Sequence, residues 1–161
     1  MSLFFESIES QITRHFAYFF IQDVEYIMDF SNDSDVMNPI LELDEQLALI
    51  LRGRNTYSVK FAVREYYESV DPKVDMFSAP KHQFKKADIQ HLKETLENLL
   101  YRHYLNFQPE CYFFIGNTPS RVRMYQKMCD NRHPILSEFI PMQLGENADC
   151  FIVKTPSYKE Q

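Results

Sequence analysis

The chain has 161 residues, a formal net charge of −6 and a composition that is 45% hydrophobic and 15% aromatic. A chain of this length folds as one domain with a substantial core, and this hydrophobic content excludes a disordered chain. Its three glycines are too dispersed for a glycine-rich phosphate loop or a dinucleotide-binding fingerprint, which argues against classical nucleotide-binding folds. We therefore expect a single domain over residues 1–161, with a loose C-terminal tail from about residue 157.

Helix and strand both remain open for the first 21 residues. Apolar residues near the N-terminus recur at helical spacing, at Leu3, Phe4, Phe5, Ile8 and Ile12. Residues 16–21 are apolar or aromatic throughout, and their periodicity does not distinguish a helix from a strand. The interpretation that we favour is a short helix followed by a strand.

A half-buried strand is predicted from Val24 to Phe30, because every second residue in this segment is apolar. The polar residues 31–35 and the pair Asn38 and Pro39 then predict a loop. The aspartates of this loop lack the central glycine and final glutamate of a calcium-binding loop, so we expect a solvated loop without a metal ion.

The segment 47–63 has the pattern of a β-hairpin. Apolar residues alternate over 47–51 and again over 57–63, with turn-forming residues between them. Residues 40–52 also fit an alternative, a helix that Asp44 caps and that places Leu47 and Leu51 on one face. Prolines and scattered polar residues predict an irregular connector over 69–84.

Two helices are predicted in the second half of the chain. The first, over 84–104, has an apolar stripe that includes His103, which we expect to be a partly buried side chain rather than a base or a ligand. The second covers 118–130, and short strands are predicted over 112–115 and 148–153, with a short strand or turn near 135–140. The fold class that follows is α+β, an antiparallel or mixed β-sheet with the two main helices packed on one face.

Cysteine and histidine spacing indicates no metal site. Cys111, Cys129 and Cys150 lie in or beside apolar runs, so we expect buried free thiols. The five histidines never place two ligands on one helix face, and we expect neither a metal nor another cofactor. Because no apolar run approaches the ~20 residues that cross a bilayer, and the N-terminus lacks a basic leader, we expect a cytoplasmic protein without membrane contact.

The distribution of charge suggests a protein partner. Residues 1–50 contain ten acidic residues against one basic residue, Arg14, whereas residues 51–161 have a net charge of +3. Such an asymmetry either presents an acidic surface to a basic partner or lets the two halves of the fold attract each other. The candidate partner-binding residues are Asp33, Asp35, Asp44 and Glu45.

The junction between the strand at 112–115 and the helix at 118–130 is the clearest candidate site. Thr118 is a good N-cap and Pro119 suits the first helical position. The unpaired N–H groups of a helix start attract anions. A cation at this end opposes the helix dipole, so we expect Arg121 to lie beside an acidic group from the first third of the chain. The candidate anion-binding residues are Asn117, Thr118, Ser120, Arg121, Arg123 and Lys127.

These patterns leave two hypotheses about function. Ser120 lacks a nucleophile-elbow motif and Cys129 lacks an activating neighbour, so no catalytic residue is predicted and a binding protein is favoured over an enzyme. The leading hypothesis is a regulatory protein that contacts a basic protein partner, as an inhibitor or immunity-type protein does. The alternative is a small-molecule or phosphate-binding protein, enzymatic or not, with its site at 116–127. The aromatic content also allows a homodimer, and the acidic net charge argues against nucleic acid.

Overall fold

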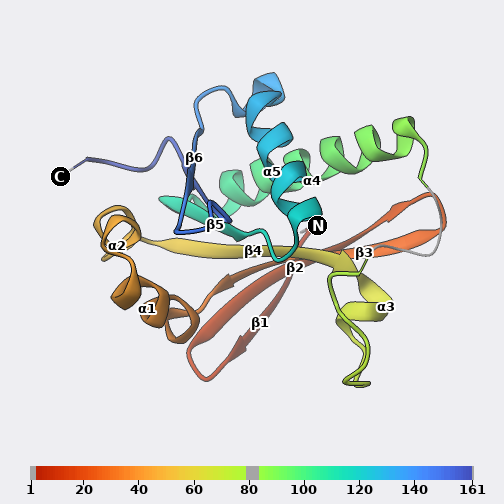
Figure 1. Ribbon diagram of the computed structural model, residues 1–161, viewed down its shortest axis with the longest axis horizontal. Helices are drawn as coiled ribbons and strands as arrows, with labels where there is room; N and C mark the ends of the chain where they lie inside the picture. The colour runs from red at the N-terminus through yellow and green to blue at the C-terminus, as the bar shows by residue number, and fades with distance from the viewer. Residues whose placement is uncertain (1–2, 79–83, 161) are drawn as a thin grey trace.

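A computed structural model describes residues 3–78 and 84–160, apart from the side chains of residues 34–37. The described chain forms a mixed seven-stranded sheet and five α-helices (Figure 1). This confirms the α+β class and the sheet. In chain order the elements are β1 (Phe5–Glu9), β2 (Ile12–Ile21), β3 (Val24–Asn32), α1 (Ser34–Leu43), α2 (Glu45–Leu51), β4 (Thr56–Val63), α3 (Arg64–Tyr67), α4 (Lys86–Phe107), β5 (Cys111–Ile115), α5 (Pro119–Asp130), the 3₁₀ turn η1 (Pro134–Leu136), β6 (Ile140–Leu144) and β7 (Cys150–Lys154).

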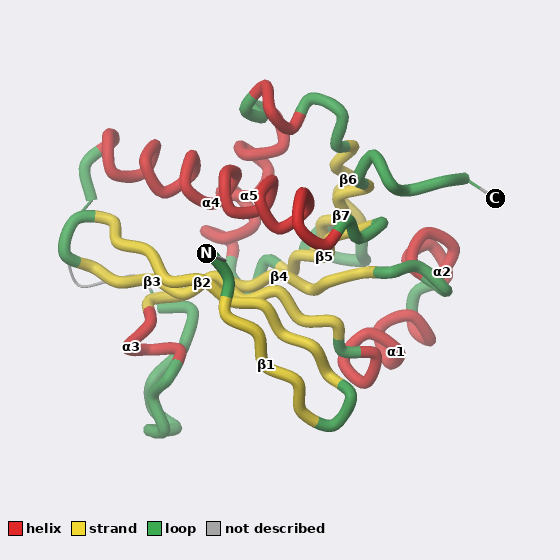
Figure 2. The backbone as a smooth tube through the Cα atoms, turned by 180° about the vertical axis from the view of Figure 1, so that it is seen from behind, coloured by secondary structure: helices red, strands yellow, loops and turns green. Residues whose placement is uncertain are grey.

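The sheet has the strand order β1-β2-β3-β4-β5-β7-β6, so β1 and β6 are its edges (Figure 2). Strands β1 to β4 pair antiparallel in sequence, and β5, β7 and β6 form a second antiparallel set. One parallel pair, β4 with β5, joins the two sets. This ladder contains only three residue pairs, from Thr56 opposite Cys111 to Ser58 opposite Phe113, and β4 continues to Val63 without pairing to β5.

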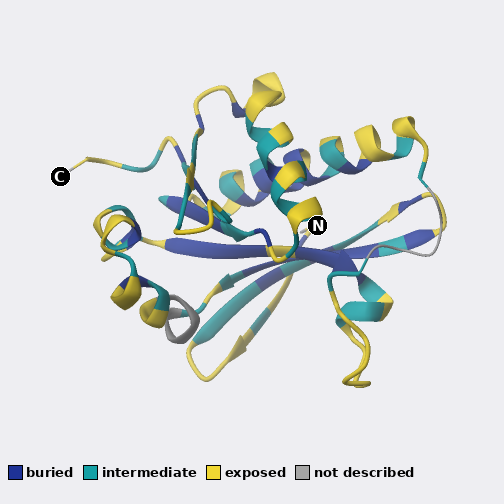
Figure 3. Cartoon of the chain, viewed as in Figure 1, coloured by how far each residue is buried: buried dark blue, intermediate teal, exposed yellow. Residues whose placement is uncertain are grey.

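Two hydrophobic clusters hold the elements together, and burial is concentrated in the central strands (Figure 3). The larger cluster contains alternate residues of β2 to β5 and β7 together with the inner residues of α4 and with Tyr125 of α5. In the smaller cluster, Leu41 of α1 and Leu47 and Leu51 of α2 pack against residues of β5 and β7, such as Phe113. In the part of the chain that the structure describes, no helix has the length and apolar character to span a membrane.

The predicted N-terminal helix is wrong. Residues 5–9 form the edge strand β1, and Ser10 and Gln11 turn the chain with positive φ angles of 49° and 68°. Pairing of β1 with β2, in a register that sets Phe5 opposite Phe16, takes precedence over the local helical spacing. The strands predicted over 16–21 and 24–30 are confirmed as parts of β2 and β3.

The first strand of the predicted hairpin is also wrong, and the alternative helix is correct. The Asp44 carboxylate accepts hydrogen bonds from the N–H groups of Gln46 (3.0 Å) and Leu47 (3.1 Å), which caps α2. Leu47 and Leu51 are then buried one turn apart. The predicted loop after residue 30 is corrected as well, because α1 begins at Ser34, and the second hairpin strand is confirmed as β4.

The elements of the second half lie close to their predicted bounds. Helices α4 and α5 and strands β5 and β7 are confirmed. Of the short strand or turn expected near 135–140, the turn is present as η1, and β6 begins at Ile140. Residues 69–78 contain no helix or strand, and the rest of the expected connector, residues 79–83, lies outside the described residues.

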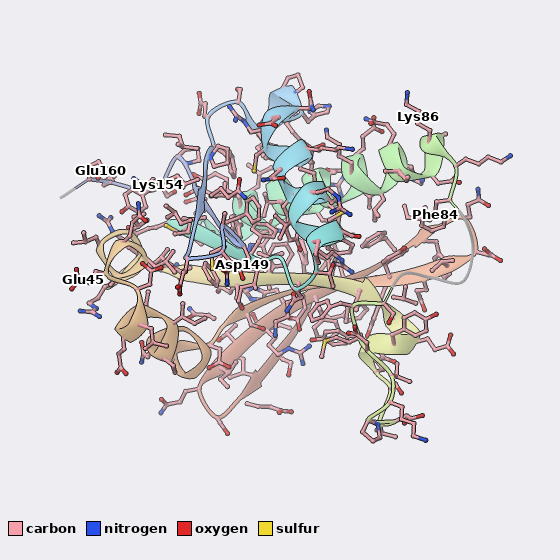
Figure 4. All side chains as sticks on the ribbon, viewed as in Figure 1. Glu45, Phe84, Lys86, Asp149, Lys154 and Glu160 are labelled. Atoms are coloured by element: carbon pink, nitrogen blue, oxygen red, sulfur yellow. The ribbon has the colours of Figure 1, made fainter. Side chains whose placement is uncertain are left out.

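The C-terminal segment contacts the fold. The Tyr158 hydroxyl donates to the Ile50 carbonyl (2.9 Å), and Lys154 pairs with Glu160 at 3.0 Å (Figure 4).

Candidate functional site

The six candidate anion-binding residues lie in several different environments. Thr118 is the N-cap of α5, as predicted, and its hydroxyl accepts a hydrogen bond from the Arg121 N–H at 3.2 Å. Ser120 accepts a bond from the Arg123 guanidinium at 3.3 Å. Asn117 lines a cleft beside β4, whereas Arg123 and Lys127 line a separate groove beside β6.

Arg121 contacts a carbonyl oxygen and two aromatic rings instead of the expected acidic group. Its guanidinium donates to the Phe61 carbonyl at 2.8 Å and lies 3.8 Å from the centre of the Phe61 ring and 5.5 Å from that of Phe77. No ion pair of Arg121 occurs within residues 3–78 and 84–160. The Arg121 guanidinium therefore binds the β4 backbone at Phe61, beyond the last residue of β4 that pairs with β5.

The turn between β5 and α5 depends on Gly116. A Cβ atom at this position would lie 2.4 Å from Cγ2 of Val122 and 3.1 Å from its Cα, a contact that side-chain movement alone does not relieve. The Gly116 N–H also donates to the Asp149 carbonyl at 2.8 Å, which fixes the turn to the segment before β7. The missing Cβ lets α5 return closely past the end of β5.

A cleft of about 170 Å³ opens where β4 and β5 diverge. Lys60 is exposed there and, within the described part of the chain, has no acidic partner. Asn117 is exposed at the same cleft, while the Ser58 hydroxyl is occupied by the Ser31 carbonyl (3.3 Å). The lining therefore combines one free cation and one free amide with apolar walls. The lining residues are Ser58, Val59, Lys60, Met76, Phe77, Phe113, Ile115, Asn117 and Tyr125.

Tyr125 forms part of this cleft from α5. Burial raises the pKa of its hydroxyl, and the Arg121 guanidinium beside it partly opposes that rise. A phenol with a raised pKa stays protonated at neutral pH and acts as a hydrogen-bond donor.

A partly buried ion pair joins Arg14 of β2 to Asp29 of β3, the residue opposite Lys60 of β4. Asp29 is 3% exposed, and its carboxylate accepts bonds from Arg14 Nη2 (2.7 Å) and Nε (3.1 Å), from Ser31 (3.3 Å) and from the Tyr67 hydroxyl. Burial, followed by the charge of Asp29, raises the pKa of Tyr67, and the hydrogen bond to Asp29 raises that of Arg14. Although Lys60 is opposite Asp29 in the strand register, these partners already satisfy that carboxylate.

Sequence reasoning missed a chain of hydrogen bonds through the core. Glu6 Oε2 lies 3.0 Å from His15 Nε2, His15 Nδ1 lies 2.9 Å from His103 Nε2, and His103 Nδ1 lies 2.7 Å from the Tyr112 hydroxyl. With both imidazoles neutral, every bond has one donor: Tyr112 donates to His103, His103 to His15, and His15 to the Glu6 carboxylate. The sequence could have suggested His103, which is on the apolar stripe, but His15 is 88 residues away and was assigned to an ambiguous segment.

Burial shifts the pKa values of His103 and Tyr112 in this chain of hydrogen bonds. His15 and His103 are 1% and 0% exposed, and their rings stack on Phe107 and Phe30 at centroid distances of 3.7 and 4.0 Å. Burial, followed by the charge of His15, lowers the pKa of His103 to about 3. Burial also raises the pKa of Tyr112. The expectation that His103 is a satisfied core side chain is confirmed, and the residue is more deeply buried than expected.

The four candidate partner-binding acids differ in their roles. Asp44 is committed to capping α2, and Asp33 is half-buried just before α1. Glu45 is exposed on the first turn of α2 (Figure 4), and the side chain of Asp35 lies outside the described residues. Of the four, Glu45 is the one whose carboxylate the structure shows on the surface without a capping role.

The three cysteines are free, as predicted, but only Cys111 is fully buried. Burial raises the pKa of Cys111 to about 12 and that of Cys150 to about 11, and it raises that of Cys129 as well. Neutral thiols are poor nucleophiles and poor metal ligands. Among the described residues, no group of three His, Cys, Asp or Glu side chains has the arrangement of a metal site.

Comparison with protein-family models, curated proteins and solved structures finds no match to this chain.

Proposed function

We propose that the protein binds a small organic anion in the cleft between β4 and β5. The divergence of these two neighbouring parallel strands is the observation that supports the proposal. In sheets with parallel strands, ligands bind beyond the carboxyl ends of neighbouring strands whose following helices lie on opposite faces. Here α3 follows β4 and contacts Asp29, while α5 follows β5 and packs Tyr125 into the larger cluster. We therefore infer that α3 and α5 lie on opposite faces of the sheet. Helix α4 also packs into the larger cluster, so we infer that it shares a face with α5.

The lining of the cleft indicates the chemistry of the ligand. Lys60 and Asn117 offer a cation and an amide to a carboxylate or phosphate group. Phe77, Phe113 and Ile115 offer apolar walls to the rest of the molecule. Among the described residues near the cleft, the guanidinium of Arg121 is occupied by the β4 backbone, so Lys60 provides the charge that selects an anion.

Replacing Lys60 with glutamine is expected to weaken binding of such anions about tenfold, the loss typical of one charge-assisted hydrogen bond. The probes are inorganic phosphate and a panel of small carboxylates and organic phosphates, measured by thermal shift and then by titration calorimetry. Lys86→Gln is the matched control, because Lys86 is exposed at the start of α4 (Figure 4). The proposal fails if no probe stabilises the native protein, or if both variants bind equally well.

A second candidate function is contact with a basic protein partner through α1 and α2. Leu43 and Leu49 are 91% and 86% exposed, far more than an ordinary surface leucine, and acidic Glu42 and Glu45 are exposed on the same two helices. Glu45 and Leu49 are four residues apart on α2 and so lie on the same side of it. Exposed leucines and acidic residues on these two helices match the chemistry of a basic amphipathic helix.

A synthetic helix with leucines on one face and lysines on the other tests this second candidate. Replacing Leu43 and Leu49 with serine is expected to weaken its binding about tenfold in fluorescence anisotropy, because two apolar contacts are lost. Leu105→Ser, at an exposed leucine of α4, is the control. A scrambled peptide that binds equally well would show that charge alone attracts the probe and would remove the patch from consideration.

A further inference from the structure

Two adjoining spaces lie beside α5 and β6; they are distinct from the cleft that contains Lys60, although Tyr125 lines both that cleft and one of the two spaces. One is an apolar cavity of about 70 Å³, here called the α4–α5 cavity. The other is a polar groove of about 640 Å³, here called the α5–β6 groove. They share four lining residues: Cys129, Arg132, Pro141 and Phe151. The cavity and the groove therefore meet at these four residues.

The α4–α5 cavity has an almost wholly apolar lining. Leu96 and Leu100 come from α4, Met128 from α5, and Phe139 from the segment after η1. The buried acid on its wall, Glu97, is already satisfied: one oxygen binds Lys93 Nζ at 2.7 Å and the other accepts the His133 N–H at 2.7 Å. Both oxygens of Glu97 have a hydrogen-bond partner and the rest of the lining is almost wholly apolar, so the cavity suits a hydrocarbon.

The α5–β6 groove has the opposite character. Among the described residues, Arg123, Lys127 and Arg132 line it together with one acid, Asp130. Within the described residues none of the three cations forms an ion pair; Arg132 donates to the Cys129 carbonyl at 3.3 Å, and Arg123 donates to Ser120. Arg132 is the cation that lines both spaces, and so it is placed where an anionic group would follow an apolar chain.

We propose that these two spaces form one binding site for a short straight-chain carboxylic acid. The hydrocarbon chain occupies the α4–α5 cavity, and the carboxylate lies in the groove beside Arg132. A cavity of about 150 Å³ accepts benzene, so one with about half that volume accepts about three carbons. With the carbons that cross the shared boundary, the best acid has about four to six carbons in total.

Chain length gives the first test. Acetate, butanoate, hexanoate and decanoate are titrated against the native protein, with the matching primary amides as uncharged controls. Affinity is expected to rise about threefold to fourfold per methylene up to butanoate or hexanoate, and then to stop rising. An affinity that does not depend on chain length, or amides that bind as tightly as acids, would overturn the proposal.

Arg132→Gln gives the second test. It is expected to weaken hexanoate binding about tenfold while leaving hexanamide binding unchanged. Arg102→Gln, at an exposed position of α4, is the matched control. Lys60→Gln separates this site from the proposed function: it must leave hexanoate binding unchanged, and a loss there would assign the acid to the β4–β5 cleft instead.

The reactivity of Cys129 gives a third test, which uses the native protein and needs no substitution. Because it lies at the boundary of the two spaces, saturating hexanoate is expected to slow its alkylation by iodoacetamide at least fivefold, as followed by mass spectrometry. Cys150, half-buried and absent from both linings, is the internal control and should react at the same rate with or without hexanoate. Equal protection of both thiols would indicate general stabilisation and contradict the assigned site.

Discussion

Replacing Arg14 with methionine is expected to lower the free energy of unfolding by about 3 kcal/mol. The substitution leaves the Asp29 carboxylate, which is 3% exposed, without the guanidinium that it binds at 2.7 and 3.1 Å. The expected loss is at the lower end for breaking a buried ion pair, because Arg14 is 35% exposed and Tyr67 still donates to the carboxylate. Urea unfolding at pH 7 measures the loss.

Two further variants separate loss of the ion pair from loss of packing. Removing both charges, in Arg14→Met with Asp29→Leu, is expected to recover most of the stability, because no buried charge remains uncompensated. Arg64→Met removes an arginine that pairs with Glu25 and Glu68 in more exposed surroundings, and a much smaller loss is expected. Equal losses for Arg14→Met and Arg64→Met would contradict the special cost assigned to Asp29.

The sequence predicts those elements whose pattern is local and unambiguous. Helix α4 has an apolar stripe over several turns, and α5 begins at an N-cap threonine followed by proline, so their signals do not depend on distant residues. The local pattern of residues 5–9 predicts a helix, but these residues form the strand β1. Their helical spacing is weaker than the pairing that Phe5 and its neighbours gain against β2 in the folded sheet.

The sites depend on contacts that no local pattern contains. The junction before α5 could be predicted from Thr118 and Pro119, but the partner of Arg121 is the carbonyl of Phe61, 60 residues earlier. The cleft beside Lys60 exists because two parallel strands pair over three residues and then diverge, which the composition of either strand does not indicate. A hydrophobic periodicity identifies a buried face but leaves open which distant polar groups meet on it.

Buried His103 is expected to make the protein less stable below pH 6.5. His103 has a pKa of 6.5 in an unfolded chain and about 3 in the fold, where burial is the main cause of the decrease and the charge of His15 adds to it. Above pH 6.5 the residue is neutral in both states, and it contributes no pH dependence. Between pH 6.5 and about 3 the unfolded chain binds a proton that the folded chain does not, so the stability falls with falling pH.

The hydrogen bonds around His103 explain why the fold resists this proton. In the neutral state His103 Nδ1 accepts from Tyr112, and Nε2–H donates to His15. A protonated His103 has no acceptor site left, so the Tyr112 hydroxyl loses its partner in the core.

Unfolding free energies at pH 7.5 and pH 5 provide the test. The contribution of His103 is about 1.4 kcal/mol per pH unit below 6.5, so the native protein is expected to lose about 2 kcal/mol from this residue between the two conditions. His103→Gln retains a donor and an acceptor but does not titrate, and its loss between the two conditions should be smaller by that amount. His91→Gln, at an exposed position of the same helix, should change nothing. If His103→Gln and the native protein lose equal stability, the depressed pKa of His103 is not the source of the pH dependence.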